Sequence, residues 1–222
     1  MEEHIVRIES IHPVTHNVKR FRITKPQGYK FEPGQATEIS INKPAWREKR
    51  NPFTFTSLNA WPYLEFTIKI YPERRGVTNE LNKLNPGDEL IIHDVWGAID
   101  YKGEGYFIAG GAGITPFISI LRQLNSENLL KSNQLFFSNR TSNDIILHKE
   151  LDAMLGANVH YVITAEENSA FENGRIDKQY LVSHVTDFTK HFYVCGPDKM
   201  VQDLTQTLSE LGASADQLVF EK

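Results

Sequence analysis

The sequence predicts an N-terminal antiparallel β-barrel followed by an α/β domain with a parallel sheet. Short strand-like segments punctuated by glycine and proline fill about the first hundred residues, as in barrels built from closely spaced strands. From about residue 103, strand-like and helix-like segments alternate, which is typical of βαβ units. This change of pattern predicts two domains, residues 1–101 and residues 102–222.

The predicted barrel strands are rich in β-branched and aromatic residues or alternate polar with apolar residues. They cover residues 5–8, 18–23, 37–41, 53–56 and 64–70. One short helix is predicted at residues 78–84. In the second domain the predicted strands cover residues 106–109, 134–137, 159–164, 192–195 and 218–220. The predicted helices between them cover residues 117–124, 145–155, 178–183 and 199–211.

Composition excludes several classes of protein. The 222 residues are 40% hydrophobic and 23% charged, as in ordinary globular chains. Lys and Arg total 24 against 28 Asp and Glu, so no nucleic-acid partner is predicted. The single cysteine, Cys195, excludes a disulfide framework and any cluster held by several cysteines of this chain. No metal site is predicted, because the sequence lacks H-E-x-x-H and its eight histidines are scattered.

The chain is also expected to be soluble and cytoplasmic, without a membrane partner. Its longest uncharged apolar stretch, residues 106–121, is too short to span a bilayer and contains glycines and a proline. The N-terminus, Met1-Glu2-Glu3-His4, is acidic rather than a basic signal region.

The strongest local motif is Gly110-Gly111-Ala112-Gly113-Ile114-Thr115-Pro116, between a predicted strand and a predicted helix. Glycines permit a tight turn and a close approach of backbone to ligand. Thr115 can cap the helix and Pro116 suits its first position, so that free amides face a phosphate. A tight turn without a ligand remains the alternative.

A second turn, Gly76-Val77-Thr78, opens the helix predicted in the barrel half. Its amides and the Thr78 hydroxyl can hold another phosphate by the same physics. Plain N-capping by Thr78 explains the same residues and is favoured by the turn alone.

Five motifs in this order resemble those of the ferredoxin–NADP reductase-like flavoproteins over nearly the whole chain. They are residues 31–35 (F-x-P-G-Q), residues 50–54 (R-x-[YF]-[ST]), the turn at 76–78, the turn at 110–116 (G-G-x-G-I-T-P) and residues 193–197 with C-G-P. The resemblance implies that the barrel binds FAD and that the second domain binds NAD(P)H. It also implies phosphate contacts by the two turns, through Gly76, Val77, Thr78, Gly110, Gly111, Gly113, Thr115 and Pro116, and nucleotide contacts by Gly196 and Pro197.

The resemblance further implies roles for four side chains. Phe53 is expected to lie against the isoalloxazine ring, and the Thr54 hydroxyl to hydrogen-bond near its reactive N5. Lys69 is a candidate for charge near the flavin phosphates or a solvated strand residue. Cys195 is expected beside the nicotinamide; the alternative is a buried small hydrophobe.

Two features depart from the family pattern. The arginine usually stands two residues before the aromatic, where this chain has Asn51. Arg50 is one step further away and points to the other face of a regular strand, although a bulge would restore its contact with the flavin phosphates. Relatives often end in an acid followed by an aromatic that covers the flavin, whereas this sequence ends Phe220-Glu221-Lys222. The nicotinamide face of the flavin is then expected to be either open or covered by Phe220. Glu221 is a candidate proton relay, with a frayed tail as the alternative.

The end of the second α/β strand bears on the choice of nicotinamide nucleotide. Residues 137–141, Phe-Ser-Asn-Arg-Thr, contain no acid to bind a ribose hydroxyl. Ser138 and Arg140 can both donate to a 2′-phosphate, which favours NADPH over NADH. Similarity of this segment to NADH-using cytochrome b5 reductases leaves NADH possible, and Asp144 is expected to cap the following helix.

The predicted function is a flavin-dependent oxidoreductase that passes electrons to a small redox protein such as ferredoxin or flavodoxin. The alternative is a flavin-binding regulatory or electron-transfer subunit without turnover of its own. An acidic partner needs local positive charge on this acidic chain. Two basic runs flank the proposed flavin motifs and supply it: Lys43, Arg47, Lys49 and Arg50, then Arg74 and Arg75. A solvated loop is the other explanation of these charges.

Overall fold

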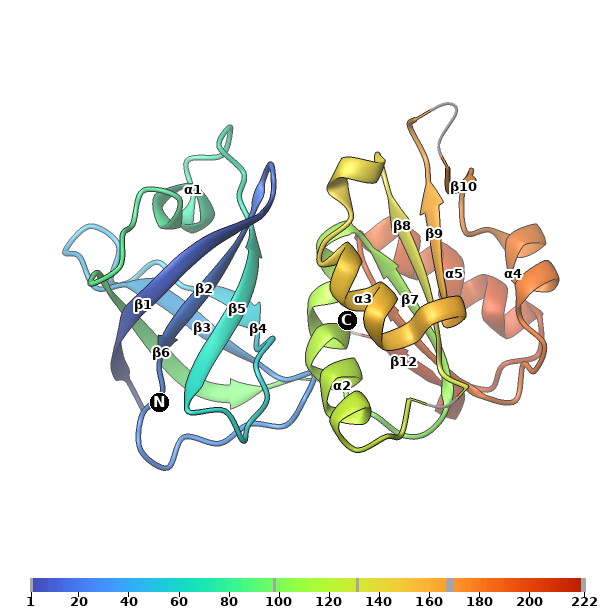
Figure 1. The fold of residues 1–222 in the computed structure, drawn as a ribbon, viewed down its shortest axis with the longest axis horizontal. Coiled ribbons are helices and arrows are strands. Elements are labelled where there is room, and N and C mark those ends of the chain that lie inside the picture. Colours follow the sequence, from blue (N-terminus) through green and yellow to red (C-terminus); the bar gives the residue numbers. More distant parts are fainter. Residues whose placement is uncertain (1, 98, 131, 167–169, 221–222) are drawn as a thin grey trace.

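The computed structural model describes residues 2–97, 99–130, 132–166 and 170–220, which form two lobes side by side (Figure 1). The first lobe is an antiparallel six-stranded sheet, and the second is a parallel six-stranded sheet with helices on both faces. The predicted fold class is confirmed. Among the described residues, no helix is long and apolar enough to cross a membrane.

The first sheet curls into a barrel. Its strands run in the order β4-β3-β6-β1-β2-β5, and every neighbouring pair is antiparallel. A bridge between Phe55, just after β4, and Phe66 of β5 brings the two edges of the sheet together. The strands are β1 (His4–Thr15), β2 (Val18–Thr24), β3 (Ala36–Ile41), β4 (Asn51–Thr54), β5 (Tyr63–Lys69) and β6 (Glu89–Trp96), with the short helix α1 (Val77–Leu81) between the last two.

The second sheet has the order β10-β9-β8-β7-β11-β12, and all of its pairs are parallel. Its strands are β7 (Gly105–Gly110), β8 (Gln134–Asn139), β9 (Val159–Ile163), β10 (Glu172–Asn173), β11 (His191–Cys195) and β12 (Leu218–Phe220). The helices are α2 (Thr115–Ser126), α3 (His148–Leu155), α4 (Lys178–His184) and α5 (Asp198–Glu210).

Alternation along the buried strands divides this sheet into two apolar faces. Phe107 and Ala109 of β7 pack with α2 and α3, while Tyr106 and Ile108 pack with α4 and α5. Both faces are covered, so the strands are apolar on both sides rather than alternating polar with apolar.

The strand order reverses at β7. The chain goes from β7 outward through β8 to β9, and β11 then pairs with the other side of β7. In open α/β sheets, ligands bind beyond the carboxyl ends of the strands at such a reversal. Those ends are Gly110 of β7 and Cys195 of β11, which are predicted site residues.

Contacts of the F-x-P-G-Q turn fasten the barrel to helix α2. Gly34 has φ +96°, a conformation that favours glycine. Its N–H donates to the Ser119 hydroxyl at 3.0 Å. A Cβ at this position would collide with the carbonyl oxygen of Ile99. This motif therefore helps to hold the two lobes together.

Tyr193 of β11 holds the segment that connects the two sheets. Its hydroxyl donates to the Gly103 carbonyl at 2.7 Å and accepts the N–H groups of Lys102 and Gly103 at 2.9 and 3.0 Å. Burial raises the pKa of this phenol to about 12, so it stays a donor throughout the physiological range.

The predicted elements differ from the structure mainly at their ends. Strand β6 and the two-residue strand β10 are not among the predicted elements. Helix α3 begins at His148 rather than at Ile145, because a 3₁₀ turn at Ser142–Asp144 precedes it. Helix α2 begins at Thr115, two residues before the predicted start.

Candidate functional site

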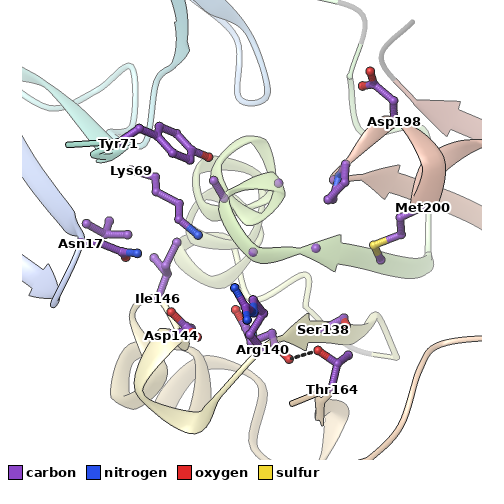
Figure 2. Close-up of a pocket in the computed structure, with 18 of the residues that line it drawn as sticks. Asn17, Lys69, Tyr71, Ser138, Arg140, Asp144, Ile146, Thr164, Asp198 and Met200 are labelled. Atoms are coloured by element: carbon purple, nitrogen blue, oxygen red, sulfur yellow. Dashed lines mark hydrogen bonds between the residues drawn. The ribbon is translucent and has the colours of Figure 1, made fainter. Parts of the chain in front are cut away.

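A cavity of about 730 Å³ lies where the barrel meets the carboxyl edge of the parallel sheet (Figure 2). Residues of both lobes line it, so neither lobe forms the site alone. The barrel contributes Asn17, Val18, Lys69, Tyr71 and Arg74. The α/β lobe contributes Gly110, Gly111, Ala112, Gly113, Ser138, Asn139, Arg140, Asp144, Ile146, Thr164, Gly196, Pro197, Asp198 and Met200.

The glycine-rich turn is a 3₁₀ turn at Gly111–Ile114 that leads directly into α2. The expectation that Thr115 caps α2 is wrong: Ile114 holds the cap position, and the Thr115 hydroxyl donates to the Ala112 carbonyl at 3.1 Å. Pro116 is accordingly the second helical residue. Gly111 has φ +52° and open space where a Cβ would stand, which leaves its surface free for a ligand.

The other glycines of the site permit two turns to pack on one another. A Cβ on Gly113 would collide with the carbonyl group of Cys195, and one on Gly110 would meet Met200 and Pro197. A Cβ on Gly196 would be 3.2 Å from the Gly110 backbone. The turn after β7 and the turn after β11 are thus in direct contact, which sets the shape of the cavity wall.

Cationic side chains enter the cavity from the barrel. Figure 2 shows Lys69 and Tyr71 reaching from the end of β5 toward the glycine turn. The Arg74 guanidinium lies 4.6 Å from the centre of the Tyr71 ring. Tyr71 is a site residue that was not predicted from the sequence; the available signal was its position two residues after Lys69.

The end of β8 forms the opposite wall, with Ser138, Asn139 and Arg140 on the cavity. Both polar atoms of the Asn139 side chain are buried and have no hydrogen-bond partner among the described residues. Such orphaned groups are costly unless a ligand or water satisfies them. The Asn139 backbone carbonyl accepts the Thr164 hydroxyl at 3.2 Å (Figure 2).

Asp144, the acid that follows β8, lines the main cavity and has one carboxylate oxygen 3.7 Å from His16 of the barrel. The other carboxylate oxygen accepts from the N–H and the hydroxyl of Thr141, at 3.0 and 2.8 Å. Asp144 thereby closes a capping box on the 3₁₀ turn at Ser142–Asp144, rather than on the α-helix that follows.

A second cavity, of about 300 Å³, continues from the first: Lys69, Tyr71 and Ala112 line both. It brings Phe53 and Thr54 of β4 to the same space as Cys195 of β11. Thr115 and Pro116 of the glycine turn, and Thr78, line it as well. The two predicted catalytic residues, Thr54 and Cys195, therefore share one cavity although they belong to different lobes.

The turn that opens α1 differs from the N-capping expected of Thr78. Gly76 holds the N-cap position without a side-chain hydrogen bond, and Thr78 lies inside the helix. The Val77 side chain is buried in the barrel core. Only Thr78 of these three lines the second cavity, while the space around Gly76 is open.

Arg50 does not line any of the cavities described here. Its guanidinium lies 3.1 Å from a Glu3 carboxylate oxygen and 3.8 Å from Glu38. This agrees with the departure from the family pattern noted in the sequence. Phe220 lines a third cavity of about 670 Å³, together with Val194 and Cys195, rather than the cavity that holds Phe53. Glu221 lies outside the described residues.

Comparisons with known proteins agree with this geometry. A family described as Oxidoreductase NAD-binding domain matches residues 107–206. The reductase component of propane 2-monooxygenase from Rhodococcus jostii is 26% identical over 97% of this chain, and the match covers 62% of that protein. NADH-cytochrome b5 reductase 2 from Candida glabrata is 27% identical, over 96% of this chain and 82% of that protein. The chain thus spans less than two thirds of the Rhodococcus relative.

Solved structures share the fold over the whole chain. A ferredoxin NADP⁺ reductase from Neisseria gonorrhoeae superposes with a TM-score of 0.84, at 20% identity, over 100% of this chain and 98% of that chain. In this chain a barrel is joined to a parallel sheet, and the G-G-x-G-I-T-P turn meets the C-G-P turn where the strand order of that sheet reverses. The whole chain thus shares the fold of a ferredoxin NADP⁺ reductase, and residues 107–206 match the family described as Oxidoreductase NAD-binding domain.

Proposed function

We propose that the protein is an NAD(P)H-dependent flavoprotein reductase. It takes hydride from NADPH onto FAD and passes electrons to a small redox protein of the ferredoxin or flavodoxin type. The observation that carries the proposal is the shared cavity of Thr54 and Cys195. A hydride donor held by the α/β lobe and an acceptor held by the barrel would meet there.

The residues present suit FAD in the barrel lobe, for which we take residues 1–101. The Phe53 ring is half-buried on the second cavity and offers an aromatic face to a flat ring system. Thr54 offers a neutral donor beside it. Lys69 and Arg74, on the adjoining cavity, supply positive charge for the phosphates, and the open α1 turn adds backbone amides. Arg50 is not needed for this arrangement.

The α/β lobe, residues 102–222, suits a nicotinamide nucleotide. Gly111 lines the main cavity and has open space beside it, so that the backbone amides at the start of α2 are candidate donors for a pyrophosphate. Ser138 and Arg140 line the far end, where they can donate to a 2′-phosphate. The orphaned Asn139 amide is placed to bond the nucleotide. Cys195 and Gly196 form the wall beside the hydride-transfer position.

Bound FAD supplies the two-electron acceptance of hydride and the release of electrons one at a time. The protein's part is to align donor and acceptor and to tune the acceptor. Contact between the Gly110 and Gly196 turns fixes the nicotinamide wall, and the Thr54 hydroxyl stabilises charge that develops at the accepting atom. Because these groups belong to two lobes, a rigid junction is required for efficient transfer.

Anaerobic reduction tests the proposal. The full chain, reconstituted with FAD, is mixed with NADPH and then with NADH while the flavin band near ~450 nm is followed. Rapid bleaching by either donor is expected. A chain that binds no flavin, or a flavin band that persists with both donors, would refute reductase activity. Persistence of the band would favour a binding or regulatory subunit.

The subunit alternative is supported by the relatives' names. The Rhodococcus relative is the reductase component of a monooxygenase, and a Chromohalobacter relative is the reductase subunit of glycine betaine monooxygenase. Turnover with free acceptors, such as ferricyanide, distinguishes an independent reductase from a subunit that works only when assembled. Cytochrome b5 belongs in the same screen, because the Candida relative is a cytochrome b5 reductase.

The basic run before β4 is our proposed docking surface for an acidic acceptor. Lys43 and Arg47 have about 45% of their side chains exposed, and the Lys49 ammonium lies over the Trp46 ring at 4.3 Å. Glu3 offsets part of this charge through Arg47 and Arg50. The run leads directly into residues 51–54, which line the second cavity.

Charge reversal distinguishes docking from a solvated loop. The double variant Arg47→Glu/Lys49→Glu should raise the KM for ferredoxin or flavodoxin while leaving ferricyanide reduction unchanged. Rising salt should have the same selective effect. Lys178→Glu, on helix α4, is the matched control and should alter neither activity. Equal effects on both acceptors would show that the run is not the docking surface.

A further inference from the structure

Three potential metal ligands meet on the side of the parallel sheet away from both cavities of the proposed reductase site. His160, Glu172 and His184 each offer a nitrogen or carboxylate oxygen, and these atoms all lie within 4.8 Å of one another. They come from β9, β10 and α4, which lie side by side at the sheet edge remote from the barrel (Figure 1). None of the three residues lines a cavity described above.

The register of the sheet brings two of them together. Glu172 of β10 pairs with Val162 of β9 in parallel, and His160 lies two residues before Val162. Since side chains alternate along a strand, His160 and Glu172 point to the same face. Helix α4 covers that face, and His184 is its last residue. No local sequence motif predicts this cluster, because each of the three residues is twelve positions from the next.

The hydrogen bonds of His184 leave its second nitrogen available. Nδ1 lies 2.9 Å from the Tyr180 backbone carbonyl, which can only accept, so Nδ1 carries the hydrogen. The ring is further held by stacking on the Tyr180 ring at 3.9 Å. A backbone carbonyl that orients an imidazole in this way is the usual support of a metal-binding histidine. Nε2 then faces a Glu172 oxygen at 3.3 Å.

The spacing of the ligand atoms suits a small transition-metal ion. The second Glu172 oxygen lies 3.4 Å from Nδ1 of His160. Zinc bonds nitrogen and oxygen at ~2.0–2.1 Å, so tetrahedral ligands lie about 3.4 Å apart. Both nitrogen–oxygen separations are close to this value, and all three ligand atoms lie within 4.8 Å of one another. Two imidazoles and one carboxylate favour zinc over Mg²⁺ or Ca²⁺, which take oxygen ligands.

We propose that His160, Glu172 and His184 form a zinc site that joins β9, β10 and α4. The half-buried histidines and the exposed glutamate leave the fourth position to water. Bound zinc ties together three elements at the end of the sheet, and it stabilises the folded chain more as the free zinc concentration rises above the dissociation constant. The site does not rest on the reductase activity, because its residues and those of the flavin and nucleotide cavities are separate.

Zinc titration of the full-length, chelator-treated protein with its FAD bound tests the site. Calorimetry should give one zinc per chain and a higher melting temperature, with no heat from Mg²⁺. Co²⁺ should develop the visible absorption of a four-coordinate ion, at wavelengths beyond the flavin band. His160→Ala and His184→Ala should each weaken zinc binding about tenfold or more, and Glu172→Gln should do so as well.

His148→Ala is the matched control. His148 also lies beside a carboxylate, 3.4 Å from Asp152, but it belongs to none of the three-residue groups found among the described residues. This variant should bind zinc like the parent. Failure to bind one zinc at about 100 µM metal, or equal losses in His148→Ala and the ligand variants, would overturn the proposal. Circular dichroism of each variant separates lost binding from lost folding.

Discussion

Arg122 of α2 and Glu65 of β5 form a buried ion pair across the junction of the two lobes. The Arg122 Nη1 atom lies 2.7 Å from Glu65, and both side chains are only 7% exposed. The same nitrogen donates to the Thr56 carbonyl, while Nε and Nη2 donate to Glu150 of α3. Although burial opposes the charge, the two carboxylates raise the pKa of Arg122. One guanidinium thus links the barrel to two helices of the other lobe.

Removing this guanidinium should destabilise the protein strongly. Arg122→Met removes the closest charge partner of the buried Glu65 and leaves it with Arg20 at 3.9 Å and the Thr56 hydroxyl; breaking a buried ion pair typically costs about 3–5 kcal/mol. Urea unfolding at neutral pH measures the loss. Glu65→Gln added to Arg122→Met should restore part of it, because the buried charge is then gone.

The exposed pair Lys178–Glu210, at 3.0 Å, is the control for this variant. Lys178→Met should cost no more than about 1 kcal/mol, because exposed ion pairs contribute little. If Arg122→Met costs no more than Lys178→Met, the pair does not hold the lobes together.

The contact between the two glycine turns should not accept a methyl group. A Cβ on Gly113 would collide with the Cys195 carbonyl, so Gly113→Ala should cost about 1–3 kcal/mol, as overpacking does. Gly76 has φ −120° and no atoms within 4 Å of an added Cβ. Gly76→Ala should therefore leave the melting temperature of the FAD-free protein nearly unchanged. Equal melting temperatures for the two variants would contradict the role assigned to Gly113.

The arrangement of elements was predictable because its signals are local. Polar–apolar alternation, turn residues and the change near residue 103 to alternating strands and helices predicted both sheets and the four longer helices. The missed strand β6 has four consecutive buried residues, Leu90 to His93, so it lacks a clear alternation. Strand β10 is two residues long and exists only through its pairing with β9. The expected caps at Thr78 and Thr115 were wrong because neighbouring residues hold those positions.

The site was predictable only where residues adjacent in sequence form it. The glycines of the turn and residues 138–140 line the main cavity, and each set is a run of neighbours in the sequence. The pairing of Arg122 with Glu65, 57 positions apart, has no signature in either segment. The cluster of His160, Glu172 and His184 has no sequence signature either. The prediction of no metal site was based only on the absence of known ligand spacings in the sequence. The ion pair of Arg50 with Glu3 was also not predictable, because Glu3 precedes β1 and lies 47 positions away in the sequence.

Arg140 should determine the preference for NADPH. Its side chain lies on the main cavity, at the end of β8 (Figure 2). Losing a hydrogen bond to a charged phosphate costs about 1.5–3 kcal/mol, so Arg140→Ala should raise the KM for NADPH about tenfold or more. The KM for NADH should not change. Steady-state ferricyanide reduction with each donor measures this ratio, with the exposed Arg175→Ala as control. An unaltered NADPH/NADH ratio rejects the assignment.

The Thr54 hydroxyl should affect the rate of flavin reduction more than the binding of either cofactor. Thr54→Val keeps the shape of the cavity wall and removes the donor. A hydrogen bond worth about 1.4 kcal/mol in the transition state corresponds to a tenfold slower reduction. Stopped-flow bleaching measures the rate, and fluorescence titration measures FAD affinity. Thr54→Ser should retain the parent rate; a Ser variant as slow as Val would show that the methyl group, rather than the hydroxyl, matters.

His93 should make the barrel sensitive to mild acid. The side chain lies on β6, the residue is 1% exposed, and neither ring nitrogen has a hydrogen-bond partner among the described residues. Burial, followed by the nearby Arg50 charge, lowers the pKa of His93 below its ordinary value of 6.5. The unfolded chain therefore binds a proton that the folded chain resists, and the free energy of unfolding falls as pH drops below about 6.5. The loss stops growing below the folded pKa.

Substituting an apolar residue for His93 should remove this part of the pH dependence. His93→Leu eliminates both the titrating ring and its orphaned nitrogens, so its stability at pH 7 should equal or exceed that of the parent. Urea unfolding at several pH values between 7 and 5 gives the two curves, which should diverge as pH falls. His12→Leu, an exposed position on β1, is the control and should follow the parent curve. Parallel curves for His93→Leu and the parent would mean that the buried imidazole is protonated as readily in the folded barrel as in the unfolded chain.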